Sequence, residues 1–361
     1  MEHPEQPKKK KIVKKVLLIV AAVVLILALL IALVPGTALG VIWNLLNKME
    51  RVEGTESTIS ASEYQEFMEN QGTDETIYDE VVDASDITWD TEPEIIDNGP
   101  NVINILLIGS DSRVPGVRSR SDTMILCSLN KERKTLTMTS FMRDIYVQIP
   151  SADPNRINAA YVFGGMDRLN GTIERNFGVH VDGDFAVEFD SFMDVIDLVG
   201  GVSINLTEKE VAYMNSNLYN GYGLLTNKPV YVVGSNYMTG AEALGYSRIR
   251  YIDSDFGRTQ RQRNVLTAIF NKCKTLSVPQ LYKLMEQVLP MLTTNMDNAT
   301  ILSYAAQAAP LLSELKLETM RIPVDGTWNG VMIDGMAVLR VDMNANRLAL
   351  QEALYGDDSE E

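Results

Sequence analysis

An uncharged apolar segment near the N-terminus is the feature that most constrains how this chain of 361 residues can fold. Residues 16–34 are 19 consecutive residues without a charge or a strongly polar group, and Pro35 and Gly36 end the run. A helix rising ~1.5 Å per residue would cross roughly 30 Å of hydrocarbon over this length. A cleaved signal peptide is the alternative, but its apolar region is usually shorter. We therefore expect an uncleaved transmembrane helix over 16–34.

The charges on either side of this segment predict its orientation. Residues 1–15 contain six Lys and two Glu, whereas residues 50–100 contain 16 acidic residues and one Arg. Positive flanks stay on the cytoplasmic side, so we expect 1–15 to be a basic cytoplasmic segment and the rest to lie outside the cell. Residues 35–100 have little sustained apolar periodicity, which predicts an acidic extracellular linker. The net charge of −16 lies mainly there, and the absence of a basic face argues against a nucleic-acid partner.

The folded domain is expected over 101–361, including a C-terminal extension. Its strand-like apolar runs are residues 102–108, 123–129, 135–140, 185–189, 202–206 and 317–322. Helical patterns occupy residues 157–176, 191–199, 258–272 and 279–312, and capping boxes stand at 207–210 and 239–242. This alternation predicts an α/β fold, a mixed α-β-α sandwich whose central mixed sheet has helices on both faces. Cys127 and Cys273 fit buried free thiols, although a bridge stays possible outside the cell.

Charged side chains gather where the first three strands of this domain should end or begin. Asp111 directly follows the first strand, and Asp122 directly precedes the second. The loop between them carries Arg113, Arg118 and Arg120, while Arg143 and Asp144 follow the third strand. Ligands of open α/β sheets bind at such strand ends. Arginine forks match phosphate oxygens, and interspersed aspartates suit a hard divalent cation, so the pattern predicts a pyrophosphate site.

A second group of arginines lies between residues 248 and 263. Arg248 and Arg250 would diverge on a helix, so they share a target only if that helix has ended or if one of them is structural. Arg258 and Gln262 are four residues apart and would share one helical face. Asp255 either caps this helix or supports an arginine. Any single arginine is more often a surface charge or a salt bridge, and only the joint pattern favours a site.

The chain resembles the LytR-CpsA-Psr family of bacterial cell-envelope proteins over roughly residues 101–272. Seven segments in order carry the resemblance: 106–113, 120–123, 143–144, 156–161 with 164–165, 199–202, 241–250, and 255–258 with 261–262. The resemblance implies a Mg²⁺ site on Asp111 and Asp122. It also implies pyrophosphate binding by a set of arginines with a neighbouring glutamine, namely Arg120, Arg143, Arg248, Arg250, Arg258 and Gln262. Arg113 and Asn158 fall in the same motifs.

The resemblance implies a membrane-anchored phosphotransferase. Such an enzyme moves an anionic glycopolymer, of the teichoic acid or capsular polysaccharide type, from a polyprenyl-pyrophosphate carrier to peptidoglycan. Positioning and charge neutralisation would dominate this chemistry, with Asp111, Asp122, Arg143 and Arg248 nearest to the reacting groups. Three alternatives stay open: a regulatory module that binds prenyl pyrophosphates without turnover, a pyrophosphate hydrolase, and a receptor whose acidic linker senses the cell wall.

Overall fold

The structure, a computed structural model, describes residues 39–52, 78–89, 93–110, 120–188, 191–217, 230–249, 252–253, 255–273, 275–312 and 314–356. The predicted transmembrane segment 16–34 lies outside these residues. Among the helices that the structure describes, none is long and apolar enough to cross a membrane.

A central sheet of seven strands organises the chain, in the spatial order β1-β10-β7-β2-β3-β4-β11. Its strands are β1 (Glu50–Arg51), β2 (Val102–Ser110), β3 (Ser121–Asn130), β4 (Thr135–Phe141), β7 (Gly183–Glu188), β10 (Leu292–Thr294) and β11 (Lys316–Ile322). The pairs β2–β3 and β3–β4 are antiparallel, whereas β2–β7 and β4–β11 are parallel. The predicted mixed sheet is therefore confirmed, and the strands expected at 123–129 and 135–140 form an antiparallel pair.

Nine described helices surround the sheet, and three small strand pairs lie beside it. The helices are α2 (Leu39–Leu46), α4 (Ala159–Phe177), α5 (Ser191–Leu198), α6 (Glu208–Asn217), α7 (Gly240–Ser247), α8 (Asp255–Cys273), α9 (Val278–Val288), α10 (Asn298–Ala308) and α11 (Met343–Tyr355). The strand pairs are β5 (Tyr146–Val147) with β6 (Asn155–Arg156), β8 (Val202–Leu206) with β9 (Gly234–Met238), and β12 (Trp328–Ile333) with β13 (Met336–Val341).

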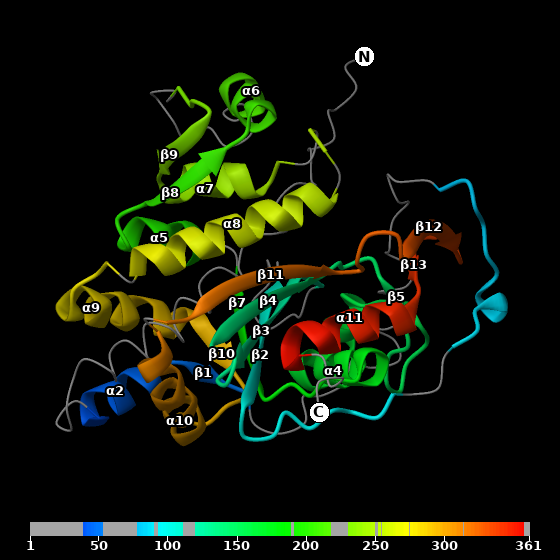
Figure 1. Ribbon diagram of the computed structural model, residues 1–361, viewed down its shortest axis with the longest axis horizontal. Coiled ribbons are helices and arrows are strands. Elements are labelled where there is room, and N and C mark those ends of the chain that lie inside the picture. Colours follow the sequence, from blue (N-terminus) through cyan, green and yellow to red (C-terminus); the bar gives the residue numbers. More distant parts are fainter. Residues whose placement is uncertain are drawn as a thin grey trace, which may run out of the picture.

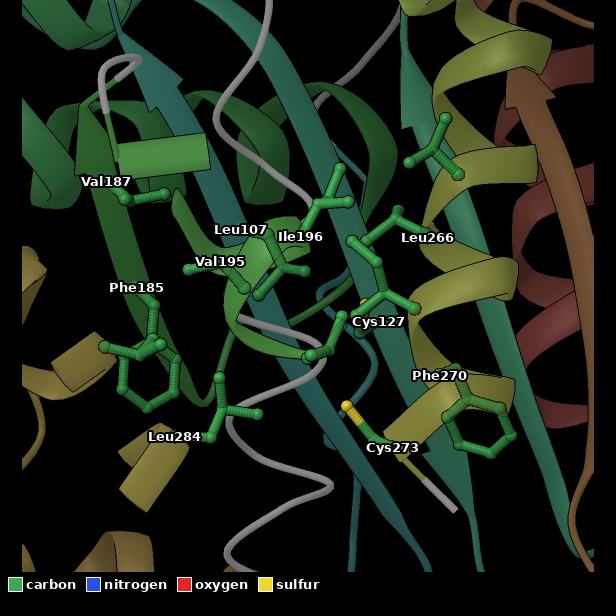
Figure 2. Close-up of a cluster of buried hydrophobic side chains, with 14 of the residues drawn as sticks. Leu107, Cys127, Phe185, Val187, Val195, Ile196, Leu266, Phe270, Cys273 and Leu284 are labelled. Atoms are coloured by element: carbon green, nitrogen blue, oxygen red, sulfur yellow. The ribbon is translucent and has the colours of Figure 1, made fainter. Parts of the chain in front are cut away.

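Alternating side chains of the strands build one apolar layer on each face of the sheet. Helices α5 and α8 cover one face and α4 with α11 cover the other, as Figure 1 shows. On the α8 side, Leu107 of β2 and Phe185 of β7 belong to one buried cluster with Leu266 and Phe270 of α8 (Figure 2). On the opposite side, Leu106 of β2 packs in a second buried cluster with α4 and α11. Helices on both faces were predicted, and the period of two along each strand explains them.

A kink divides helix α4 into two helical parts, in agreement with the two successive helical patterns expected at 157–165 and 166–176. Gly164 and Gly165 depart from helical geometry, and Gly165 has a φ of +63°, which favours glycine. Both cysteines, Cys127 and Cys273, are buried free thiols (Figure 2), and burial raises the pKa of each to about 12. The interpretation as free buried thiols is thus confirmed.

The segment before Asn101 differs from the expected solvated linker wherever the structure describes it. In α2, Leu45 and Leu46 are fully buried against the α8-side core. Strand β1 extends the central sheet through parallel pairing with β10. Residues 78–89 pack on β12 and β13, and Val82 N–H donates to Met332 O at 2.9 Å. These pieces belong to the folded unit because short apolar runs within the acidic stretch find partners more than 200 residues away.

Candidate pyrophosphate site

The edge where β2 ends and β3 begins carries a local irregularity. Ser110 pairs with Ser121 and Gly109 pairs with Thr123, so Asp122 is an extra residue in β3. Such β-bulges redirect side chains and are common next to active sites. The backbone of Asp122 therefore lies at the edge from which the chain leaves toward Asp111. Asp111, Arg113 and the Asp122 side chain lie outside the described residues, and among the described residues no cluster of three or more potential metal ligands exists.

Arg143 lies at the same edge, two residues after β4. Its Nε donates to Asp144 Oδ2 at 3.2 Å, and its side chain is 26% exposed. The other oxygen of Asp144 lies 3.8 Å from Nε of Arg156, which also donates to Ala337 O at 3.1 Å. Each Asp144 oxygen thus faces an arginine. We infer that Asp144 positions Arg143 and leaves its guanidinium partly open to solvent.

Asn158 connects the two strand ends. Its backbone N–H donates to Arg143 O at 3.4 Å, and its carbonyl accepts from Ser121 N at 3.3 Å and from Ser121 Oγ at 3.4 Å. The side-chain Oδ1 is buried and accepts no hydrogen bond from the described residues. Asn158 therefore holds the loop of Arg143 against the start of β3. Its side-chain oxygen also remains available as an acceptor at the site.

Two further predicted arginines lie at the ends of elements. Arg120 is half-buried and directly precedes β3. Arg248 caps the C-terminus of α7, where its backbone N–H donates to Gly245 O at 3.1 Å. We expected Arg248 and Arg250 to share a target only if the preceding helix had ended. Helix α7 does end at Ser247, before both residues. Arg250 itself lies outside the described residues.

Helix α8 contributes a buried cation and a buried amide on one face. Arg258 is 2% exposed and Gln262 is 4% exposed, and their spacing of four residues puts them on the same side of the helix. Burial, followed by the nearby charge of Arg261, holds the pKa of Arg258 well below its ordinary value. Because the charge of Arg258 is buried, binding an anion would stabilise this guanidinium more than it would stabilise an exposed one.

Arg261, which directly precedes Gln262 in α8, has a different environment. Its Nη1 donates to Asp253 Oδ2 at 2.9 Å and to Glu210 Oε1 at 3.3 Å, and its Nη2 donates to Ile249 O at 2.9 Å. Burial lowers the pKa of Arg261, but these two carboxylates together raise it above its ordinary value. A side chain at Gly257 would collide with the Asp253 carboxylate, so this glycine allows the ion pair to close. Arg261 is therefore a structural residue that fixes the start of α8.

Arg263 was not assigned to the site from the sequence, yet it has features of an anion-binding residue. It is 3% exposed, and its Nε and Nη1 have no partner among the described residues. Burial and the neighbouring Arg321 of β11 lower its pKa to about 10. Arg263 lies three and seven residues before Leu266 and Phe270, on the sheet-facing side of α8. That spacing was the signal in the sequence, since an arginine in an apolar stripe must find a buried partner.

Comparisons with known proteins place the chain in a family. A family model described as the LytR_cpsA_psr family matches residues 57–350. The chain belongs to this family. The resemblance predicted from seven motifs is thus confirmed, and the match extends well beyond residues 101–272 on both sides.

Several family members are similar over much of this chain. A TagU from Bacillus cereus, named a polyisoprenyl-teichoic acid–peptidoglycan teichoic acid transferase, is 35% identical over 178 residues, which are 48% of this chain and 54% of TagU. A Staphylococcus aureus protein named regulatory protein MsrR is 30% identical over 72% of this chain and 78% of its own length. The chain thus spans about half of TagU but most of MsrR.

Solved structures share the fold. The crystal structure of Bacillus subtilis TagT has a TM-score of 0.56 and 27% identity, covering 72% of this chain and 94% of TagT. A TagT structure with bound octaprenyl pyrophosphate lipid has a TM-score of 0.53 and 26% identity, covering 72% of this chain and 93% of that one. The mixed α/β architecture, with its central sheet between helices, is therefore that of family members with known structures.

Proposed function

We propose that this protein transfers an anionic glycopolymer of the teichoic acid type from a polyprenyl-pyrophosphate carrier to peptidoglycan. One observation carries the proposal: half-buried arginines lie at the sheet edge and buried arginines lie in α8, where Arg263 is close enough to Arg321 of β11 for that charge to lower its pKa. Arg258 and Arg263 are almost fully buried, and the two oxygens of Asp144 already face Arg143 and Arg156. The two oxygens of a diphosphate phosphoryl group would match the paired donors of these guanidiniums. The names of TagU and TagT agree with that substrate class.

The apolar layer between the sheet and helices α5, α8 and α9 supports a prenyl chain as the carrier. This layer includes Phe185, Val195, Leu266 and Leu284, and it begins one helical turn beyond Arg263 (Figure 2). A polyprenyl tail would enter this layer while its pyrophosphate stays with the arginines. Burial of such a tail would be favourable by about 0.8 kcal/mol per CH₂ group. This arrangement agrees with a TagT structure that holds octaprenyl pyrophosphate.

Within the site, arginines would stabilise the charge that develops on the leaving polyprenyl phosphate as an acceptor hydroxyl attacks in line. Arg143, Arg248 and Arg258 are assigned this role, with Arg120 and Arg250 as further phosphate ligands and Gln262 as a hydrogen-bond donor. Asn158 keeps the Arg143 loop in register with β3. Arg113 is proposed as a further phosphate ligand from the loop between β2 and β3.

Mg²⁺ is the cofactor that we propose, held by Asp111 and Asp122. The bulge puts the backbone of Asp122 at the edge where β2 ends at Ser110, the residue before Asp111 in the sequence, and carboxylate oxygens are the donors that Mg²⁺ prefers. Mg²⁺ usually binds through one or two carboxylates plus substrate phosphates, so two aspartates beside a diphosphate fit. When bound, the ion would supply charge neutralisation at the phosphate that stays with the sugar.

We also propose that residues 16–34 anchor the protein in the bacterial cell membrane as a single span, with 1–15 in the cytoplasm and the catalytic domain outside. Pyrophosphate carriers with long prenyl chains are membrane lipids, so this location would bring the enzyme to its donor. Capsular polysaccharide is a second polymer class that the same site could accept.

The test uses the full-length chain in detergent micelles with Mg²⁺, a polyprenyl-pyrophosphoryl oligosaccharide and a peptidoglycan oligosaccharide, with products identified by mass spectrometry. We expect a phosphodiester-linked conjugate that disappears with EDTA and with Asp111→Ala or Arg143→Ala. Near-normal turnover in either variant would refute the site assignment, and activity that survives EDTA would refute the metal.

A regulatory module without turnover is the second candidate, since MsrR carries a regulatory name and matches 72% of this chain. Intact lipid retained by the protein, with no product, would favour that candidate. Free sugar phosphate without conjugate would favour a hydrolase instead.

A further inference from the structure

A polar cavity lies near the candidate site, and phosphoryl transfer does not explain it. It has a volume of about 210 Å³ and is formed by residues 87–89, β5, the end of α4, the end of β13 and the start of α11. Its side chains include an aromatic pair, three arginines and two amides: Trp89, Tyr146, Arg175, Arg340, Arg347, Gln148 and Asn176. Pockets for drug-sized ligands are usually roughly 300–1,000 Å³. This cavity would therefore hold one small unit rather than a long chain.

The aromatic wall of the cavity is preformed. The rings of Trp89 and Tyr146 stack with their centroids 5.7 Å apart and an interplanar angle of 29°. Trp89 is fixed because residues 78–89 pack on β12 and β13, where Ile87 and Trp89 contact a small buried core. Tyr146 is buried and Trp89 is half-buried, so an apolar edge faces the cavity beside the cations. Such an edge suits the C–H face of a sugar or polyol.

The charge of the lining is positive. Arg347 donates from Nε and Nη2 to Asn176 O at 3.3 and 3.2 Å, and Arg175 Nε lies 3.4 Å from Gln148 Oε1. The Arg340 side chain is exposed and makes no hydrogen bond or ion pair within the part of the chain that the structure describes. Asp342 is the one acidic residue among the described residues of the lining, and its Oδ1 accepts from Ala345 N at 2.9 Å as the N-cap of α11. The described lining of the cavity therefore contains three guanidiniums and one carboxylate, and that carboxylate already accepts a hydrogen bond.

Two more carboxylates lie close by without lining the cavity. Asp334 and Asp153 are near enough to add to the effect of burial on the Tyr146 hydroxyl, whose pKa is raised. They border the Tyr146 side, whereas Arg340 and Arg347 lie on β13 and α11. The positive part of the cavity is thus the part that a phosphate could reach.

The cavity is joined to the candidate site through β13. Leu339 N–H donates to Asp144 O at 2.8 Å, and Tyr146 pairs with Arg156 across β5 and β6. Arg340 and Val341 follow Leu339 directly, so the cavity begins within roughly 7 Å of that contact along the strand. A polymer whose reacting phosphate is held by Arg143 would have its following units over this strand pair.

We propose that this cavity, the Trp89–Arg340 pocket, binds a phosphate-bearing sugar or polyol unit of the donor polymer, beyond the unit that reacts. This inference rests on the proposed function for its biological role, but the binding itself does not. Arginines favour an anionic polymer over an uncharged glycan strand, and the stacked aromatic pair favours a unit with an apolar face. The pocket would select for polymer that carries several phosphates.

Binding is tested with the full-length chain in detergent micelles and a lipid-free tetramer of glycerol phosphate, followed by calorimetry and by tryptophan fluorescence. We expect the tetramer to bind, Arg340→Glu to weaken binding by at least about tenfold, and the matched variant Arg133→Glu to change it less than about twofold. Arg133 is equally exposed but lies at the other end of α11. Trp89→Phe should retain binding that Trp89→Ala loses. Absence of binding, or equal losses in both charge variants, would overturn the proposal.

A peptidoglycan disaccharide-pentapeptide is the competing probe. If it binds in an Arg340-dependent way and the glycerol phosphate tetramer does not, the pocket is an acceptor site and the proposal is wrong. Turnover separates this inference from the proposed function. With a long polymer donor, Arg340→Glu should raise KM about tenfold at unchanged kcat, whereas a donor with one short oligosaccharide should be unaffected. If the wild type turns over neither donor, the proposed function fails, and the tetramer titration still decides the pocket.

Discussion

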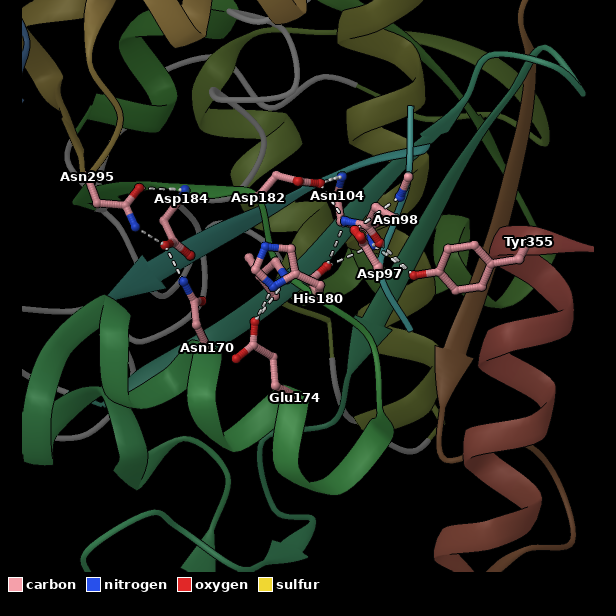
Figure 3. A network of polar contacts seen from close by, with 12 residues as sticks. Asp97, Asn98, Asn104, Asn170, Glu174, His180, Asp182, Asp184, Asn295 and Tyr355 are labelled. Carbon is pink, nitrogen blue, oxygen red and sulfur yellow. Dashed lines mark hydrogen bonds and ion pairs between the residues drawn. The ribbon is translucent and has the colours of Figure 1, made fainter. Parts of the chain in front are cut away.

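The two ends of the central sheet differ in how the described residues pair their buried charges. At the start of β2 and β7, Asp184 accepts hydrogen bonds from Asn170 Nδ2 at 2.6 Å and Asn295 Nδ2 at 2.5 Å (Figure 3). Asp182 accepts from Asn104 N at 2.7 Å and Asn98 Nδ2 at 2.6 Å. At the other end, Arg263 is buried with two nitrogens that lack partners among the described residues.

This difference supports the proposal that one end of the sheet is structural and the other binds a ligand. Buried charges that have dedicated donors fix the chain, and here they connect α4, β7 and the residue after β10. Buried cations with too few carboxylates cost stability, and a ligand would recover that cost on binding. Substitutions at the two ends should therefore have opposite effects on stability and activity.

Arg258→Met should produce the largest effect. Removing one preorganised donor from a charge-stabilising site typically costs about 10²- to 10³-fold in rate, and Met keeps most of the side-chain volume. We expect that loss in transfer to peptidoglycan, with a smaller loss of stability than Arg261→Met causes. The contrasting variant is Arg261→Met, which leaves Glu210 without its buried cation and should unfold more easily. Equal destabilisation by both variants would contradict the distinction between them.

Asp184→Ala should mainly reduce stability. It leaves the amides of Asn170 and Asn295 without their shared acceptor, at a cost of about 3 kcal/mol in the free energy of unfolding. Urea denaturation would measure this, with the exposed Asp194→Ala of α5 as the control. Transfer by the folded variant should stay within about twofold of the wild type. A large loss of activity at a temperature where the variant is folded would show that this end is not purely structural.

Arg263→Met should stabilise the ligand-free protein by about 1 kcal/mol, because it removes a buried charge whose one hydrogen-bond acceptor among the described residues is the neutral amide of Gln260. The same substitution should weaken retention of polyprenyl pyrophosphate about tenfold. Thermal unfolding with and without the lipid measures both effects, and the gain in melting temperature on adding lipid should be smaller than in the wild type. A variant that is destabilised without lipid would indicate that Arg263 is structural.

The smallest effect concerns pH. Burial, which is the largest cause, raises the pKa of Asp182 above its ordinary 3.8, although the bonds from Asn104 and Asn98 oppose it. The folded state therefore holds this proton above pH 3.8, where the unfolded chain has released it. Stability from this group should fall as pH rises through that window. Asp182→Asn should remove this contribution from the pH profile of unfolding, and an unchanged slope would argue against it.

The sequence was most informative where the signal was local. Apolar runs predicted β2, β3 and β4, and the capping box at 239–242 predicted the start of α7. The strand β10 was missed because its three residues, Leu292–Thr294, are too short to show a period. The pairing of β1 with β10 was missed for a different reason, since acidic composition suggested solvation and the partner lies about 240 residues away.

Among the site residues too, local motifs could be predicted from the sequence, whereas contacts between distant residues could not. Motif spacing identified Arg143, Arg258 and Gln262, and the structure places the first at the strand edge and the other two on one buried face of α8. The structural role of Arg261 could not be predicted, because Glu210 and Asp253 reach it only in the folded chain. The role of Asn158 was hidden as well, since its contacts run mainly through the backbone. The predictions for Asp111, Arg113 and Arg250 stay open.

The burial of α2 limits how far the folded domain could extend from the membrane. If residues 16–34 cross the membrane, only residues 35–38 separate that span from a helix whose Leu45 is packed in the core. Four extended residues cover at most about 14 Å. The domain would then rest on the bilayer surface rather than range through the cell wall. Acceptor strands would have to come within one domain diameter of the membrane, which would restrict attachment to the innermost, most recently made layer of peptidoglycan.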